Sequence, residues 1–158
     1  RPLAEQGYAP AQFNLGYMYD NGEGVIKNYK EAAKWFRLAA EQGFALAQFN
    51  LGAMYGEGLG VTQDYKEAVK WYRLAAEQGN AWAQYLLGYM YSEGQGVFLD
   101  YVYAHMWFNI AASNGYEDAQ ISRDAVAGVM TPALISKAQD LARECVKMAY
   151  FTSTYKGC

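Results

Sequence analysis

The chain has 158 residues, of which 53% are hydrophobic and 18% are charged, so it carries enough apolar side chains to bury a sizeable core. Its formal net charge of −3 at pH 7 gives it no strong attraction to nucleic acid or to an anionic membrane surface. No apolar stretch approaches the roughly 18–20 residues that a membrane-spanning helix requires, so no membrane span is expected.

The first segment, residues 4–7, is the earliest copy of a motif that returns along the chain. Its Gln6-Gly7 pair recurs every 36 residues, as Gln42-Gly43, Gln78-Gly79 and, altered, Asn114-Gly115, and tryptophan recurs at Trp35, Trp71 and Trp107. A fixed period of roughly 20–50 residues is typical of a solenoid, in which each unit buries its apolar face against its neighbours. Because residues 4–7 match the end of a repeat, we expect the natural protein to extend upstream.

A first helix is predicted in each unit from Ala11, Leu15 and Met18, whose i, i+4, i+7 spacing gives one buried stripe. Residues 22–24 (Gly-Glu-Gly) then break the helix, since glycine adopts the positive φ that a tight connection needs. This loop joins two helices and follows no strand, so it does not predict a phosphate-binding site. The loop carboxylates predict a solvated acidic rim rather than a cation site: Glu23, Glu57 and Glu93.

A second helix is predicted from Asn28, a favourable N-cap, with Glu31 three residues later completing a capping box. It ends at Gly43. Its basic residues alternate with glutamates such as Glu31 beside Lys34, which is typical of a solvated helix face rather than a nucleic-acid site.

The buried face of this second helix is expected to hold Ala32, Ala39 and one of Trp35 or Phe36. Small residues recur with the period on both helices and allow the helices to approach closely. They are Gly16, Ala32, Ala39 and Ala40, then Gly52, Ala68, Ala75 and Ala76. Each unit is therefore predicted to be a helical hairpin.

Two runs within each unit resemble the Sel-1-like repeat, a relative of the tetratricopeptide repeat. They are Ala11–Tyr19 with Gly22–Val25, and Tyr29–Gly43, and the pattern recurs over Ala47–Gly79 and Ala83–Gly115. The resemblance implies an all-α fold, namely a right-handed α/α superhelix (solenoid) of helix–turn–helix repeats with a period of 36. It also implies an adaptor that holds other proteins together.

The period predicts how the chain is organised. Residues 1–7 are the tail of a preceding repeat, residues 8–43, 44–79 and 80–115 are three repeats, residues 116–149 are capping helices, and residues 150–158 are a tail.

The third repeat is expected to be covered from its far side, because charged positions of the earlier repeats become apolar there, at Val102, Tyr103 and Met106. A helix over roughly 117–129 replaces the next first helix, and Thr131-Pro132 begins a final capping helix. Its predicted apolar stripe is Leu134, Ala138, Leu141, Ala142 and Cys145. This ending is similar to the terminal segment of many bacterial Sel-1-like proteins, which favours an envelope or periplasmic location over the cytoplasm. Residues 149–158 have no period and predict a mobile tail.

Catalysis finds no support in the pattern. The single histidine, His105, stands where the earlier repeats carry Ala33 and Val69, and no partner for metal or acyl-transfer chemistry is apparent. We therefore expect no enzyme activity, metal or cofactor. The two cysteines, Cys145 and Cys158, fall off the repeat and are expected to be free thiols, with Cys145 in the core.

The candidate binding surface consists of the first-helix residues outside the buried stripe, because the first helices line the concave face in this family. Tyrosine and asparagine anchor peptides well, through large apolar area and two-way hydrogen bonding. For Phe13, Phe49 and Tyr85, packing between repeats is an equally good explanation. For Tyr17 and Tyr89 the alanine in the middle repeat favours a surface position. The full set is Phe13, Asn14, Tyr17, Phe49, Asn50, Ala53, Tyr85, Leu86 and Tyr89.

The predicted function is a non-enzymatic scaffold that binds an extended segment or helix of a partner protein along this face. One alternative is end-to-end self-association through the helical face near Leu3 and Tyr8. Another is a binder of a small ligand such as a cell-wall fragment or a nucleotide, or a weak hydrolase acting on such a ligand. This alternative would require a closed polar pocket with a perturbed acid or base, and the sequence shows no group of residues that would form one.

Overall fold

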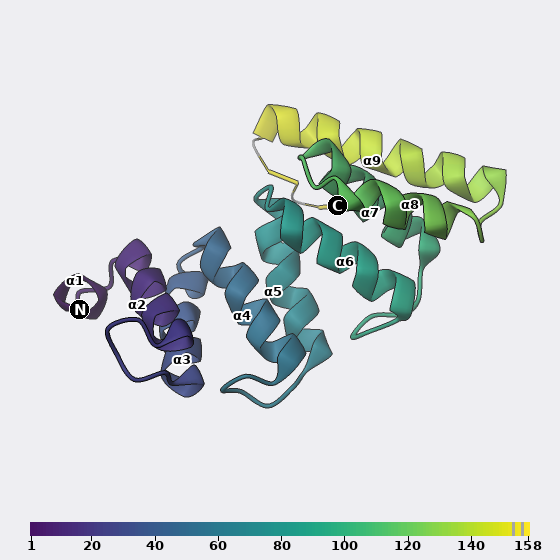
Figure 1. Cartoon of the computed structure of the whole chain (residues 1–158). Coiled ribbons are helices and arrows are strands. Elements are labelled where there is room, and N and C mark those ends of the chain that lie inside the picture. The colour runs from purple at the N-terminus through teal and green to yellow at the C-terminus, as the bar shows by residue number, and fades with distance from the viewer. Residues whose placement is uncertain (153, 156) are drawn as a thin grey trace. The chain divides into compact units, whose positions relative to one another are not determined.

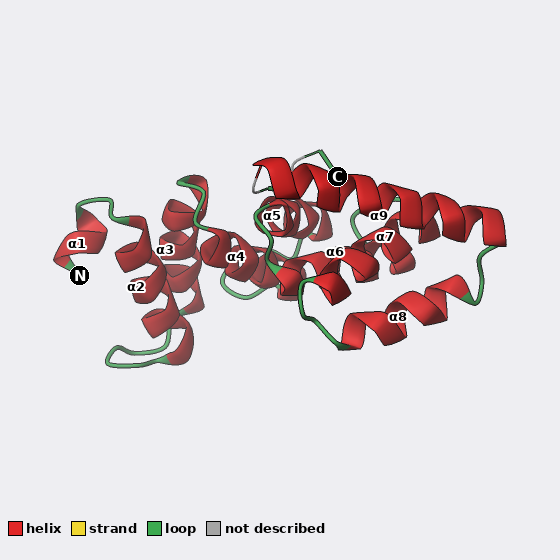
Figure 2. Cartoon of the chain, turned by 90° about the horizontal axis from the view of Figure 1, so that it is seen from above, coloured by secondary structure: helices red, strands yellow, loops and turns green. Residues whose placement is uncertain are grey.

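The computed structural model describes residues 1–152, 154–155 and 157–158, and within these ranges every regular element is a helix (Figure 1, Figure 2). First helices begin at residues 9, 45 and 81, so the all-helical fold with a 36-residue repeat is confirmed. The chain forms two compact units, each longer than a single repeat. The first unit is Arg1–Leu74 and the second unit is Ala75–Cys158. The helices are α1 (Pro2–Glu5), α2 (Ala9–Asn21), α3 (Tyr29–Glu41), α4 (Ala45–Glu57), α5 (Tyr65–Glu77), α6 (Ala81–Glu93), α7 (Tyr101–Ser113), α8 (Asp118–Ala127) and α9 (Pro132–Thr152).

The hairpin turns form as the sequence predicts, with one difference. Gly22 ends α2 in the left-handed conformation, at a φ of 77°, and Asn28 caps α3 by accepting hydrogen bonds from the N–H groups of Lys30 and Glu31. The capping box also predicts that the Glu31 side chain accepts from the Asn28 N–H. This part is wrong, because the Asn28 N–H donates to the Tyr19 carbonyl at 2.8 Å. The last turns of α2 therefore supply the acceptor that the glutamate would otherwise provide.

Glycines in the first helices let the two helices of a hairpin touch. A Cβ at Gly16 would lie 2.7 Å from the Phe36 ring, and one at Gly52 would lie 2.8 Å from the Tyr72 ring. Gly88 stands in the same relation to Phe108, at 2.6 Å. These distances are too short for any side chain, so the predicted role of the small residues is confirmed.

The predicted buried stripes form the cores of both units. In the first unit, Leu51 and Met54 of α4 share a buried cluster with Ala33 and Phe36 of α3 and with Trp71. In the second unit, the cluster around α7 and α8 is Ala104, Phe108, Ala111, Ala119 and Val126. α4 thus packs against the second helix before it as well as the one after it, which is how repeats share a core.

Buried glutamines, which the sequence patterns above did not single out, join each first helix to the preceding second helix. Each donates its Nε2–H to a backbone carbonyl eight residues earlier at 3.0–3.1 Å, and the pairs are Gln12 with Ala4, Gln48 with Ala40, and Gln84 with Ala76. The Gln12 Oε1 in turn accepts from Gln42 Nε2 at 2.7 Å. Since a buried amide is costly unless it is bonded, these glutamines fix the register between repeats. Their 36-residue spacing was a signal available in the sequence.

The C-terminal helices cover the third repeat as expected, with α8 and α9 both packing on α7 (Figure 2). Val102 and Met106 of α7 are buried, and Thr131 caps α9 by accepting from the Leu134 N–H. The predicted stripe of α9 is wrong at one position, because Leu134 is exposed while Ala138, Ala142 and Cys145 are buried.

The end of the chain overturns two expectations. Residues 149–152 continue α9, and the Tyr155 hydroxyl donates to Asn114 Oδ1 at 3.0 Å, so the chain folds back where a mobile tail was predicted. Positions 153 and 156 of that segment lie outside the described residues. Cys145 and Cys158 form a disulfide with their Cα atoms 5.7 Å apart, so the expectation of two free thiols is wrong. The pairing depends on this fold-back, which cysteine spacing alone does not reveal.

Candidate protein-binding surface

The three aromatic residues whose role was open are engaged in packing. The Phe13 ring lies 5.7 Å from Phe36 and 5.3 Å from Phe44, and the Phe49 ring lies 5.8 Å from Tyr72. In the second unit, the Tyr85 ring lies 5.5 Å from Phe108 and 4.6 Å from Tyr116. All three are half-buried, so they hold the hairpins together while leaving only part of each ring accessible.

The remaining candidates in the first unit differ in how exposed they are. Asn14 and Tyr17 of α2 are exposed, with 46% of Tyr17 accessible, while Asn50 and Ala53 of α4 are half-buried. Tyr17 touches only the edge of the packed aromatic group, its ring lying 6.4 Å from that of Phe13. A large exposed aromatic ring beside an exposed amide is a suitable anchor for a partner chain.

In the second unit, Leu86 is half-buried and Tyr89 is 43% exposed. Tyr89 lines a groove of about 310 Å³ with Tyr101 and Phe108 of α7 and with Val126 of α8. Val129, which is exposed, also lines the groove. Sequence reasoning missed this groove because α8 carries no repeat pattern that would place it beside α6.

A second groove, of about 470 Å³, lies at the other end of the chain and is mostly apolar. It is lined by Leu3 of α1 and by Ala11, Asn14 and Met18 of α2. Ala11 and Met18 are half-buried here, whereas their equivalents Ala47 and Met54 are buried. Asn14, one of the candidate binding residues, is part of the lining of this groove.

The described residues contain no group of three or more His, Cys, Asp or Glu side chains that could hold a metal ion. The pKa of His105 is lowered by burial and by the nearby Arg123, with Asp124 acting in the opposite direction. Burial raises the pKa of the Tyr72 hydroxyl, while the ring of Tyr72 lies against Gly52 in the core.

Successive helical hairpins with a 36-residue period define a helix-repeat protein. The Sel1 repeat model matches residues 9–44, 45–80 and 83–116, and the chain belongs to the Sel1 repeat family. Proteins built from these repeats generally mediate protein–protein interactions, and the fold is typically a non-catalytic scaffold.

Two solved structures illustrate the relationship, and both are bacterial. A Sel1 repeat protein from Oxalobacter formigenes is 47% identical, with a TM-score of 0.73 over 75% of this chain and 49% of that one. The protein c5321, a protective antigen present in uropathogenic Escherichia coli strains displaying an SLR fold, is 51% identical, with a TM-score of 0.72 over 73% of this chain and 25% of that one. The chain thus spans about half and about a quarter of these relatives. No curated protein matched it. Over the part of the chain that the structure describes, no helix has the length and apolar character needed to cross a bilayer.

Proposed function

We propose that this chain is a non-enzymatic scaffold that binds an extended segment or a helix of a partner protein along its first helices. The observation that carries the proposal is the pair of exposed tyrosines at equivalent positions, Tyr17 on α2 and Tyr89 on α6. Tyrosine is enriched among the residues that anchor protein interfaces.

The surroundings of each tyrosine support the proposal. Asn14 stands one turn before Tyr17 and is exposed, so its amide is available to the backbone of an extended peptide. Tyr89 stands over the groove of about 310 Å³ lined by Phe108 and Val126, which suits an apolar side chain of the partner. Phe13, Phe49 and Tyr85 would present their accessible edges, while Asn50, Ala53 and Leu86 would flank them.

The test is affinity capture from a lysate of the source organism, comparing wild type with a Tyr17→Ala, Tyr89→Ala double variant by mass spectrometry. A protein retained by wild type and lost by the double variant is expected. Removing two central anchors costs about 2 kcal/mol each, which is several hundredfold in affinity when both are engaged.

The matched control is an Ile26→Ala, Phe98→Ala double variant, which removes two exposed apolar side chains from the interhelical loops. It is expected to capture the same protein as wild type. Equal capture by the tyrosine variant would exclude the first helices as the binding surface, and loss only in the loop variant would move the interface to the loops.

A second candidate function is end-to-end self-association. The groove formed by Leu3, Ala11 and Met18 supports it, because its lining is mostly apolar. Leu3 and Tyr8 beside it are each 57% exposed. A second copy of the chain could cover these apolar side chains.

A further inference from the structure

A polar cavity of about 430 Å³ lies among α7, α8 and α9, outside the first helices. It is lined by side chains that the repeats do not share, chiefly His105, Asn109, Arg123, Asp124, Gln139 and Arg143. The C-terminal helices therefore do more than cover apolar surface, since they bring two arginines and a histidine together.

His105 is the most unusual member of this cavity. It stands where the other repeats have alanine or valine, it is 2% exposed, and its Nδ1 has no hydrogen-bond partner among the described residues. A neutral imidazole has one N–H donor and one bare nitrogen. Because an unpaired buried N–H is rarer than an unpaired acceptor, the absence of a partner favours the tautomer with a bare Nδ1 and an N–H at Nε2.

The two arginines are positioned by neighbouring side chains. Arg123 donates through Nη1 to Asn109 Oδ1 at 3.3 Å, and through Nε and Nη2 to Asp124 Oδ1 at 2.9 and 2.8 Å. Arg143 donates to Asp140. Each guanidinium has five N–H groups, so both retain donors for a further acceptor.

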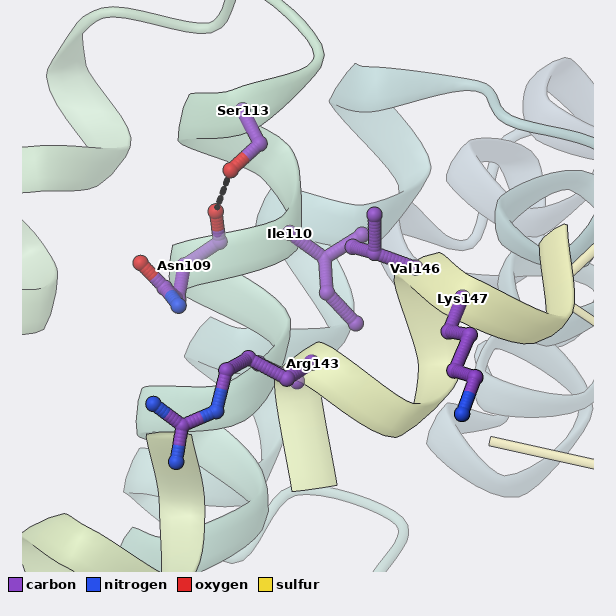
Figure 3. Close-up of a pocket in the computed structure, with 7 residues that line it drawn as sticks. Asn109, Ile110, Ser113, Arg143, Val146 and Lys147 are labelled. Atoms are coloured by element: carbon purple, nitrogen blue, oxygen red, sulfur yellow. Dashed lines mark hydrogen bonds between the residues drawn. The ribbon is translucent and has the colours of Figure 1, made fainter. Parts of the chain in front are cut away.

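A second cavity, of about 560 Å³, adjoins the first and is apolar. It lies between α7 and α9, shares Asn109 and Arg143 with the polar cavity, and is lined by Ile110 and Val146, with Lys147 at its edge. Figure 3 shows the side chains of Asn109 and Arg143 extending toward the same side of Ile110 and Val146. Three cations, Arg123, Arg143 and Lys147, thus outnumber the two carboxylates that pair with the arginines.

We propose that these two cavities together bind a small organic carboxylate. The carboxylate accepts hydrogen bonds from Arg123, Arg143 and His105 Nε2–H, and its apolar group lies against Ile110 and Val146. Arginine pairs well with carboxylates because its planar fork matches two oxygens. This site is separate from the first-helix surface and does not depend on the proposed function.

The single histidine makes the test direct. Long-range ¹H–¹⁵N spectra of the full chain report the ring nitrogens of His105 without overlap, and octanoate and N-acetylleucine are the two probes. The first tests an unbranched aliphatic carboxylate and the second an amino-acid carboxylate, and octanamide and N-acetylleucinamide are their uncharged controls. We expect an Nε2–H tautomer, with saturable ring shifts for at least one acid and none for its amide.

Two variants test the arginines. Arg143→Gln and Arg123→Gln are each expected to weaken binding by about tenfold, since each removes one charge-assisted interaction. Arg143 is exposed, so its replacement leaves the fold intact. Arg37→Gln, which removes the same charge from the first unit, is expected to bind as wild type. The proposal is overturned if neither acid shifts the ring, if the amides bind as well as the acids, or if Arg143→Gln binds unchanged.

Discussion

The glycines of the first helices decide how closely two helices can approach, and Gly52 gives the sharpest test. A Cβ at this position would lie 2.8 Å from the buried Tyr72 ring. Gly52→Ala is therefore expected to lower the free energy of unfolding by roughly 1–3 kcal/mol, as overpacking does. Urea unfolding followed by circular dichroism measures it.

Gly56 in the same helix provides the control for this prediction. A Cβ there would meet only ordinary contacts at 3.9 Å, from Ala68 and Tyr72. Gly56→Ala is expected to be neutral or to stabilise by up to about 1 kcal/mol, because alanine favours the helix. Equal losses in both variants would contradict a specific role for the close approach at Gly52.

His105 predicts a pH dependence of stability. Its pKa is lowered below the ordinary value of 6.5 by burial and by Arg123, with Asp124 opposing. The folded chain therefore binds this proton less readily than the unfolded chain, and stability falls as the pH drops below about 6.5 toward the folded-state pKa. The free energy of unfolding of wild type is expected to fall more between pH 7.5 and 5.5 than that of His105→Gln. Parallel pH profiles would rule out a contribution from His105.

Among the helices, α9 has a start that local sequence signals predict and an end that they do not. Its start at Pro132 follows from the Thr131 cap, and the helix before it, α8 at Asp118–Ala127, lies within the predicted range of 117–129. Its end does not follow from such a signal. No stop residue follows residue 149, and α9 continues to Thr152. The prediction that Leu134 lies on the buried face was wrong because a 3.6-residue period specifies a face only approximately at a helix end.

The disulfide attaches the end of the chain to α9 and predicts redox-dependent stability. Closing a loop of 13 residues restricts the unfolded chain, and reduction is expected to lower the free energy of unfolding by roughly 2–4 kcal/mol. Chemical unfolding with and without dithiothreitol measures this effect. Cys158→Ser is expected to be insensitive to the reductant. Alkylation of both thiols in the native protein without reductant would contradict the bond.

For the molecule as a whole, the predicted self-association concerns the apolar groove of α1 and α2. Light scattering over a dilution series is expected to show a dimer that dissociates on dilution. Leu3→Asp, which places a charge in the groove, is expected to remain a monomer at all concentrations. A wild-type chain that is monomeric throughout the series would exclude this candidate.

The repeat, the hairpins, the Asn28 side-chain cap and most of the buried stripes could be predicted from the amino-acid sequence. Each depends on residues within about one repeat, and the same signals occur three times, so the signals for α3 and for its copies reinforce one another. The exposure of Tyr17 and Tyr89 could also be predicted from the repeat. The equivalent position in the middle repeat is Ala53, and this variation favoured a surface position.

Other features were decided only by the tertiary structure. The Cys145–Cys158 bond depends on the fold-back of the chain end, and the surroundings of His105 combine side chains of three helices outside the repeat. The contacts of the Phe13 ring with Phe36 and Phe44 likewise became apparent only in the folded chain. Such contacts join segments that lack a shared period, so no local pattern encodes them, and they appear only when burial of apolar surface brings the helices together.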